Sequence, residues 1–185
     1  YSEDGYVSDE DAHELDYSAM LKDMQEETRA ANEERVNAGY EAVDLIGWAA
    51  QPYYDGTTHK LHWAQALKFG EAEENTLNYN IRVLGRKGYL LMNFVADMEQ
   101  LPEIERNRDT VLAMAEFNDG FRYDQFDPEY DKLAAYGIGG LVAGKVLAKT
   151  GFLAMGLLFL QKFGVVIFGG LIALVGALFK RKKTG

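Results

Sequence analysis

Hydrophobic and polar positions follow different periods in successive parts of the chain. Between residues 17 and 37, apolar side chains recur at helical spacing, with charged residues on the remaining faces. From residue 43 to residue 95, apolar and polar side chains alternate in strand-like runs, separated by glycine-containing turns such as Asp55-Gly56. Residues 99–118 return to the helical period. The pattern predicts an α+β fold in which a small antiparallel sheet is packed with helices.

The last third of the chain has a different pattern, because it is almost continuously apolar. From Leu133 to Phe179 it contains no acidic residue and is rich in Leu, Val, Ile, Phe, Ala and Gly. Residues 163–179 are an uninterrupted apolar run, within the range of about 17–25 residues that a helix needs to cross a bilayer. We therefore predict a transmembrane helix at 163–179. A Gly-rich amphipathic or membrane helix is predicted at 133–162, so that Gly-rich C-terminal membrane helices follow the α+β domain.

Small residues recur along one side of the predicted helix at 133–162. Gly137, Gly144 and Gly151 are seven residues apart, and Gly140 forms a GxxxG pair with Gly144. This spacing predicts close packing between helices, most simply between copies of the chain. The alternative is an accidental spacing, since glycine is common in membrane helices.

Two lysines interrupt this apolar segment. Lys145 and Lys149 lie one helical turn apart, and a charge near the middle of a bilayer costs at least about 2.5–3.5 kcal/mol. We expect both side chains to face lipid headgroups, a polar cavity or a pore rather than lipid tails.

The distribution of charge also divides the chain near residue 133, where the apolar segment begins. Residues 1–132 carry 12 basic and 29 acidic side chains, a formal charge of −17, whereas residues 133–185 carry seven basic side chains and no acidic one. An acidic domain argues against nucleic-acid binding. The tail at 180–185, with Lys180, Arg181, Lys182 and Lys183, is expected to stay in the cytoplasm. We expect only 163–179 to cross, which makes the domain periplasmic; the alternative is that Leu133 to Leu160 crosses as well, which would make it cytoplasmic.

The N-terminal residues form an acidic segment before the predicted domain. Residues 1–16 contain seven Asp and Glu side chains and are expected to be flexible and solvated, ahead of a soluble α+β domain with an N-terminal helix at 17–132. Alternatively, the clustered carboxylates of this segment could bind a divalent cation, although their spacing does not match that of an EF-hand loop.

Candidate chemistry in the predicted domain is sparse. The chain has no cysteine, which excludes disulfides and thiolate sites. His59 and His62 are three residues apart, so in a strand they would point to opposite faces, a poor arrangement for one metal ion. The basic run from Gly85 to Gly88 is more typical of a hairpin turn than of a phosphate-binding loop. We expect no metal, no cofactor and no catalytic residue.

Polar side chains gather on one predicted strand. Asn75, Asn78 and Asn80 precede Arg82, and they form a polar face that could bind a sugar or a peptide, or could only be the solvated side of the sheet.

Short motifs are spread from about Glu33 to the C-terminus: Gly47-Trp48, Pro52 to Asp55, Thr58 to Ala64, Asn75 to Gly88, Leu101 to Ile104, Phe117-Asn118 and Ala135 to Gly139. Together they resemble a family of bacterial membrane-anchored proteins that is known as a domain of unknown function. The resemblance implies a signal peptide upstream, an exported domain and a C-terminal hydrophobic anchor. It supplies no catalytic or ligand-binding residues.

These features favour a membrane-anchored envelope protein in the bacterial inner membrane, acting as a self-associating scaffold or as an accessory subunit of a membrane assembly. The expected partners are the lipid bilayer, further copies of the chain and other membrane proteins, and not nucleic acid. One alternative is an oligomeric channel lined by the Gly-rich helices, in which Lys145→Glu would alter ion selectivity. The other is an exported enzyme or ligand-binding domain acting on envelope material, in which His59 or Arg82 would be essential for turnover.

Overall fold

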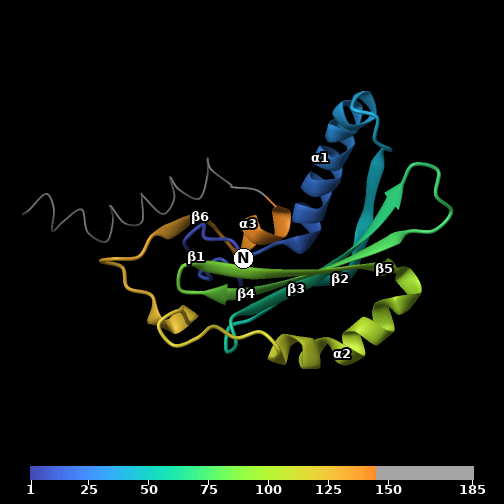
Figure 1. The fold of residues 1–185 in the computed structure, drawn as a ribbon. Helices are drawn as coiled ribbons and strands as arrows, with labels where there is room; N and C mark the ends of the chain where they lie inside the picture. Colours follow the sequence, from blue (N-terminus) through green and yellow to red (C-terminus); the bar gives the residue numbers. More distant parts are fainter. Residues whose placement is uncertain (145–185) are drawn as a thin grey trace, which may run out of the picture. The chain divides into compact units, whose positions relative to one another are not determined.

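The computed structural model of the protein describes residues 1–144 (Figure 1). In chain order the elements are β1 (Tyr6–Ser8), α1 (Tyr17–Asn37), β2 (Val43–Asp55), β3 (Lys60–Phe69), β4 (Thr76–Gly85), β5 (Gly88–Asp97), η1 (Met98–Gln100), α2 (Leu101–Ala113), η2 (Tyr123–Gln125), β6 (Leu133–Gly137) and α3 (Ile138–Ala143). The predicted α+β class is confirmed for this part of the chain.

The central sheet is an antiparallel meander in the order β2-β3-β4-β5. Side chains alternate between its two faces. On one face Leu77, Tyr79 and Ile81 pack against α2. On the other face Leu61 and Trp63 pack against β1, β6 and α3, so that helices lie on both sides of the sheet (Figure 1).

Residues 1–16, which we expected to be a flexible segment, form part of the fold instead. β1 pairs in parallel with β6, and Val7 is fully buried. The acidic side chains that suggested a solvated segment act as caps: Asp16 accepts hydrogen bonds from the backbone N–H groups of Ser18 and Ala19 at the start of α1. Asp11 accepts from the N–H groups at the start of α3, where its two carboxylate oxygens lie 2.9 and 3.0 Å from the nitrogens.

The predicted boundary at residue 132 is also displaced. We expected a continuous Gly-rich helix from residue 133, but the structure has the strand β6 and the short helix α3, which ends at Gly144 with a left-handed φ of 69°. Ile138, Leu141 and Val142 are buried in the core of the domain. The absence of acidic residues here therefore reflects burial in protein. Residues 163–179, the predicted transmembrane helix, lie outside the described residues.

Among residues 1–144, no helix combines the length and the hydropathy that crossing a membrane requires.

Candidate functional site

The outer edge of β5 is open over its central residues. Tyr89, near its start, exchanges two backbone hydrogen bonds with Ser2, at 2.9 and 3.1 Å. Backbone groups of alternate residues point to the same side of a strand, so the N–H and C=O groups of Leu91, Asn93 and Val95 point to this outer side as well. Within residues 1–144 they have no hydrogen-bond partner there.

Two of the three residues on this open edge have exposed apolar side chains. Leu91 is 46% exposed and Val95 is 73% exposed. From Gly88 to Ala96 the strand has no charged residue and no proline, and its ladder with β4 continues to Asp97 without a bulge. Lysine, proline and bulges are the usual devices that prevent an edge from pairing with another chain. β5 therefore has the properties of a strand that can accept a further strand.

A groove of about 540 Å³ lies beside this edge, between β5 and α2. Apolar side chains such as Tyr79, Ile81, Phe94 and Ile104 line it, and Arg108 is the basic residue among its polar lining groups. An added strand would project alternate side chains toward this groove and toward the opposite face of the sheet. The edge and the groove thus form one continuous candidate binding surface.

The polar strand face predicted from the sequence is largely buried rather than solvated. Arg82 is only 8% exposed, and its guanidinium lies between the rings of Trp63 and Tyr89, 5.0 and 5.8 Å from the ring centroids. Its Nη1 donates to the carbonyl of Ile81 at 3.0 Å and to Oδ1 of Asn93 at 3.3 Å. In the described part of the chain no carboxylate pairs with it. Burial lowers the pKa of Arg82.

The same buried face holds polar atoms without a partner in the described chain. They are Nε1 of Trp63, Oδ1 of Asn78 and Nε of Arg82, and all three come from the face that also carries Asn93. Asn93 therefore connects the buried Arg82 to the open edge. A guanidinium can only donate hydrogen bonds, so the Asn93 atom that faces it is the amide oxygen. The contact with Arg82 therefore sets the orientation of the Asn93 amide.

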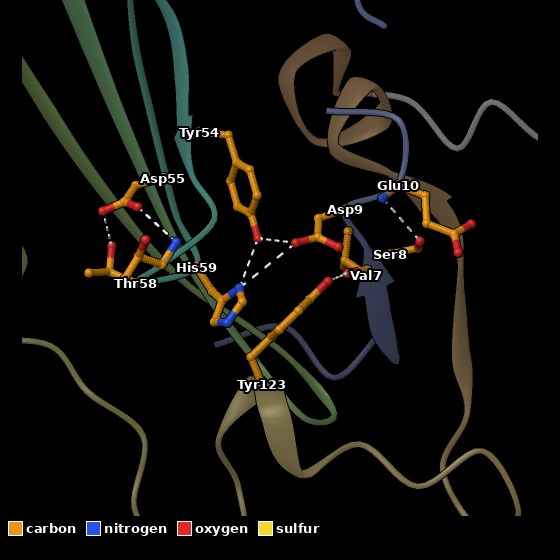
Figure 2. A network of polar contacts seen from close by, with 10 residues as sticks. Val7, Ser8, Asp9, Glu10, Tyr54, Asp55, Thr58, His59 and Tyr123 are labelled. Atoms are coloured by element: carbon orange, nitrogen blue, oxygen red, sulfur yellow. Dashed lines mark hydrogen bonds and ion pairs between the residues drawn. The ribbon is translucent and has the colours of Figure 1, made fainter. Parts of the chain in front are cut away.

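A second polar cluster joins β1 to the turn between β2 and β3 (Figure 2). The hydroxyl of Tyr54 donates to Oδ2 of Asp9 at 2.7 Å and also contacts Nδ1 of His59 at 3.0 Å. Since a hydroxyl has one proton and Tyr54 gives it to Asp9, Nδ1 of His59 is the donor in the second contact. Burial and the hydrogen bond to Asp9 raise the pKa of Tyr54, which keeps this hydroxyl protonated.

The surroundings of His59 indicate a structural role for this cluster. The imidazole stacks on the ring of Tyr123 at 4.1 Å, and the Tyr123 hydroxyl donates to the carbonyl of Val7 at 2.8 Å (Figure 2). His59 has a φ of 53°, a left-handed conformation that side chains other than glycine rarely adopt. In residues 1–144, no serine or threonine hydroxyl is hydrogen-bonded to His59. The contacts hold β1 against the sheet.

His59 and His62 do not come together. His59 lies in the turn, whereas His62 is buried on the face of β3 that packs against α2, with Nδ1 3.2 Å from the hydroxyl of Tyr79. Burial, and secondarily the charge of Arg108, lower the pKa of His62 from 6.5 to about 4. Over residues 1–144 the His, Asp and Glu side chains form no group of three that could hold a metal ion. The basic turn after β4 is tied down, since Nε of Arg86 donates to Asp131.

The predicted glycine stripe is used inside the domain where it is described. A Cβ at Gly137 would lie 2.6 Å from a carboxylate oxygen of Asp11, Gly140 is buried in α3, and Gly144 ends that helix. These three residues therefore do not share one face of a long helix. The remaining predicted site residues lie outside the described part of the chain: Gly151, Lys145, Lys149, Lys180, Arg181, Lys182 and Lys183.

Residues 1–172 match the model of the family described as Protein of unknown function (DUF2167). The chain belongs to this family. The resemblance to a domain of unknown function, based on motifs from Glu33 onward, is thereby confirmed, and the DUF2167 match also includes β1, which lies before those motifs. No curated protein and no solved structure matches the chain.

Proposed function

We propose that this member of the DUF2167 family is a membrane-anchored envelope protein that works by association, as a self-associating scaffold or an accessory subunit of a membrane assembly. Residues 163–179 would anchor it in the bacterial inner membrane, with the basic tail in the cytoplasm and residues 1–144 in the periplasm. Its partners would be the bilayer, further copies of the chain and other membrane proteins.

The open edge of β5 is the observation that carries this proposal. Three alternate residues of this strand have outward-pointing backbone groups without a partner in the described chain: Leu91, Asn93 and Val95. Two of them, Leu91 and Val95, also have exposed apolar side chains. Strand addition to such an edge is a recurrent mode of protein association, because the backbone supplies the hydrogen bonds and the side chains supply specificity. A catalytic role has less support, since the cluster around His59 is engaged in holding β1.

The test is the mass of the full chain extracted with native lipid or in mild detergent. We expect a defined oligomer for the wild-type protein and a monomer for Val95→Lys, because a lysine at the edge blocks strand pairing. Val36→Lys is the matched control: Val36 is also exposed, at 56%, but it lies on α1. A monomeric wild-type chain would contradict self-association, and an oligomer that Val95→Lys leaves intact would contradict strand addition at the β5 edge.

A further inference from the structure

We propose that one end of the domain binds the headgroups of anionic phospholipids. The surface that would do so consists of two lysines and two exposed aromatic residues, Lys87, Phe121, Tyr130 and Lys132, and we call it the aromatic–lysine surface. It lies where β4 turns into β5, beside the loop between η2 and β6 (Figure 1). This inference rests on the proposed anchoring in the inner membrane, and it names the lipid class and the residues that the domain would use there.

The four side chains line one pocket of about 670 Å³. Tyr130 is 82% exposed and Phe121 is 51% exposed. Tyrosine is enriched at the headgroup level of membranes, and phenylalanine is a usual apolar contact of proteins that lie on a membrane surface. Among the described residues, neither Lys87 nor Lys132 forms an ion pair with a carboxylate. Both ammonium groups can therefore meet lipid phosphates.

The charge of this surface differs from that of the domain as a whole. Residues 1–132 carry a formal charge of −17, so most of the domain repels an anionic membrane. The pocket has two carboxylates in its lining, Glu3 and Asp131, and Asp131 is paired with Arg86. Together with the two lysines, Arg86 makes the basic side chains outnumber the acidic ones here. The pocket is therefore a place where an acidic domain can approach an anionic lipid.

Backbone hydrogen bonds hold the parts of the aromatic–lysine surface together. The N–H of Arg86 donates to the carbonyl of Phe121 at 2.9 Å. The carbonyls of Lys87 and Lys132 accept from backbone N–H groups just before and at the start of β1, at 3.2 and 2.8 Å. Among these contacts each lysine is held through its backbone. Its side chain can be replaced without removing a hydrogen bond that the fold uses.

A fluorescent probe beside this surface tests the inference in the full chain. The native chain has no cysteine, so Glu129→Cys, next to Tyr130 in the loop, provides a single labelling site. The labelled chain is placed in nanodiscs of phosphatidylcholine with or without phosphatidylglycerol, together with a lipid that carries a nitroxide quencher on its headgroup. We expect strong quenching in discs that contain phosphatidylglycerol and weak quenching in phosphatidylcholine alone. The same label at Val36→Cys, an exposed position on α1, should be quenched in neither.

Charge reversal tests whether the two lysines make the contact. Each lysine near an anionic membrane strengthens contact by about five-fold, so Lys87→Glu combined with Lys132→Glu should lower the ratio of contacting to free domains by at least about 25-fold. Lys22→Glu combined with Arg29→Glu, at exposed positions of α1, is the matched control. It makes the same change in net charge and should leave the quenching as it is in the wild-type chain.

Quenching that is absent from both disc types, equal in them, or retained in the variant of both surface lysines would overturn the lipid-binding surface while leaving the anchor in place. A probe that is shielded without being quenched would show that protein covers this end of the domain, which also overturns the inference. A full chain that does not enter discs of phosphatidylcholine alone would contradict the proposed anchoring at residues 163–179, which is a separate result.

Discussion

The two edges of the central sheet are treated in opposite ways. On β2, α1 supplies side chains that replace a neighbouring strand: the Asn32 amide accepts from the N–H of Val43 at 2.8 Å and donates to its carbonyl at 3.0 Å. Gln25 donates to the carbonyl of Leu45 at 3.0 Å, and β2 also contains three register irregularities. β5 has a regular ladder with β4, and within residues 1–144 its outer edge is open from Leu91 to Val95.

This difference assigns different tasks to the two strands. A covered, irregular edge cannot accept another chain, whereas a regular, uncharged edge can. The fold closes the start of β2, from Val43 to Ile46, with side chains of its own and leaves β5 available for association. The predictions below probe the contrast between these edges, in order of the expected change in the free energy of unfolding.

Acid should destabilise the domain without altering the β5 edge. The pKa of His62 is about 4 in the folded state, whereas in the unfolded state it has its ordinary value of 6.5. As the pH falls, the unfolded state therefore binds a proton before the folded state does. His62 should therefore have no effect above pH 6.5 and lower the free energy of unfolding by about 3 kcal/mol as the pH falls to about 4.

Urea unfolding of residues 1–144 at pH 7 and at pH 4.5 measures this change, and His62→Gln should remove most of it. No group with a pKa in this range lies between Tyr89 and Ala96, so the native mass of the full chain should stay the same over this pH interval wherever it remains folded. A pH dependence that His62→Gln leaves unaltered would show that another group is responsible.

Gly88 closes the first residues of the β5 edge, because it allows Ser2 to approach. A Cβ at position 88 would lie 1.8 Å from the Ser2 carbonyl oxygen. Gly88→Ala should break the two backbone hydrogen bonds between Ser2 and Tyr89 and lower the free energy of unfolding by about 2–3 kcal/mol, as measured by urea unfolding.

The control for Gly88→Ala is on the opposite edge strand. Gly47 in β2 has open space where a Cβ would be. Gly47→Ala should therefore change the free energy of unfolding by less than about 1 kcal/mol. Equal losses for the two variants would show that the approach of Ser2 does not hold this end of the edge.

Asn32 closes the edge of β2 and should be the smallest of the three effects. Asn32→Ala removes both side-chain hydrogen bonds to Val43 and should lower the free energy of unfolding by about 1–2 kcal/mol. It should also expose β2 to association, seen as concentration-dependent light scattering of the variant. Asn37→Ala, at the exposed end of α1, should do neither.

The sequence predicts the meander and α1 well because their signals are local. The helical period at residues 17–37 coincides with α1, and the alternation from Val43 onward corresponds to β2 through β5. Residues 1–16 and 133–143 could not be placed in this way, since β1 pairs with β6 and Asp11 caps α3 more than 120 residues away. An apolar run without acidic residues looks the same in a protein core and in a bilayer.

The candidate site was only partly visible in the sequence. The sequence predicts the polar alternation around Arg82. The burial of the Arg82 side chain between Trp63 and Tyr89 depends on the strand order, which the alternation does not predict. The strand order also decides that β5 is an edge. An uncharged run between two turns was the available signal for an open edge, and it is equally compatible with a central strand.

Amide hydrogen exchange on the full chain in mild detergent tests the central claim most directly, when the assembled protein is compared with a dilute sample. In both states the N–H of Val43 should be protected, because Asn32 covers it. The N–H groups of Leu91, Asn93 and Val95 should be protected in the assembly and should exchange rapidly on dilution to monomers. Rapid exchange of these three amides in the assembled protein would contradict the claim that the β5 edge accepts a further strand.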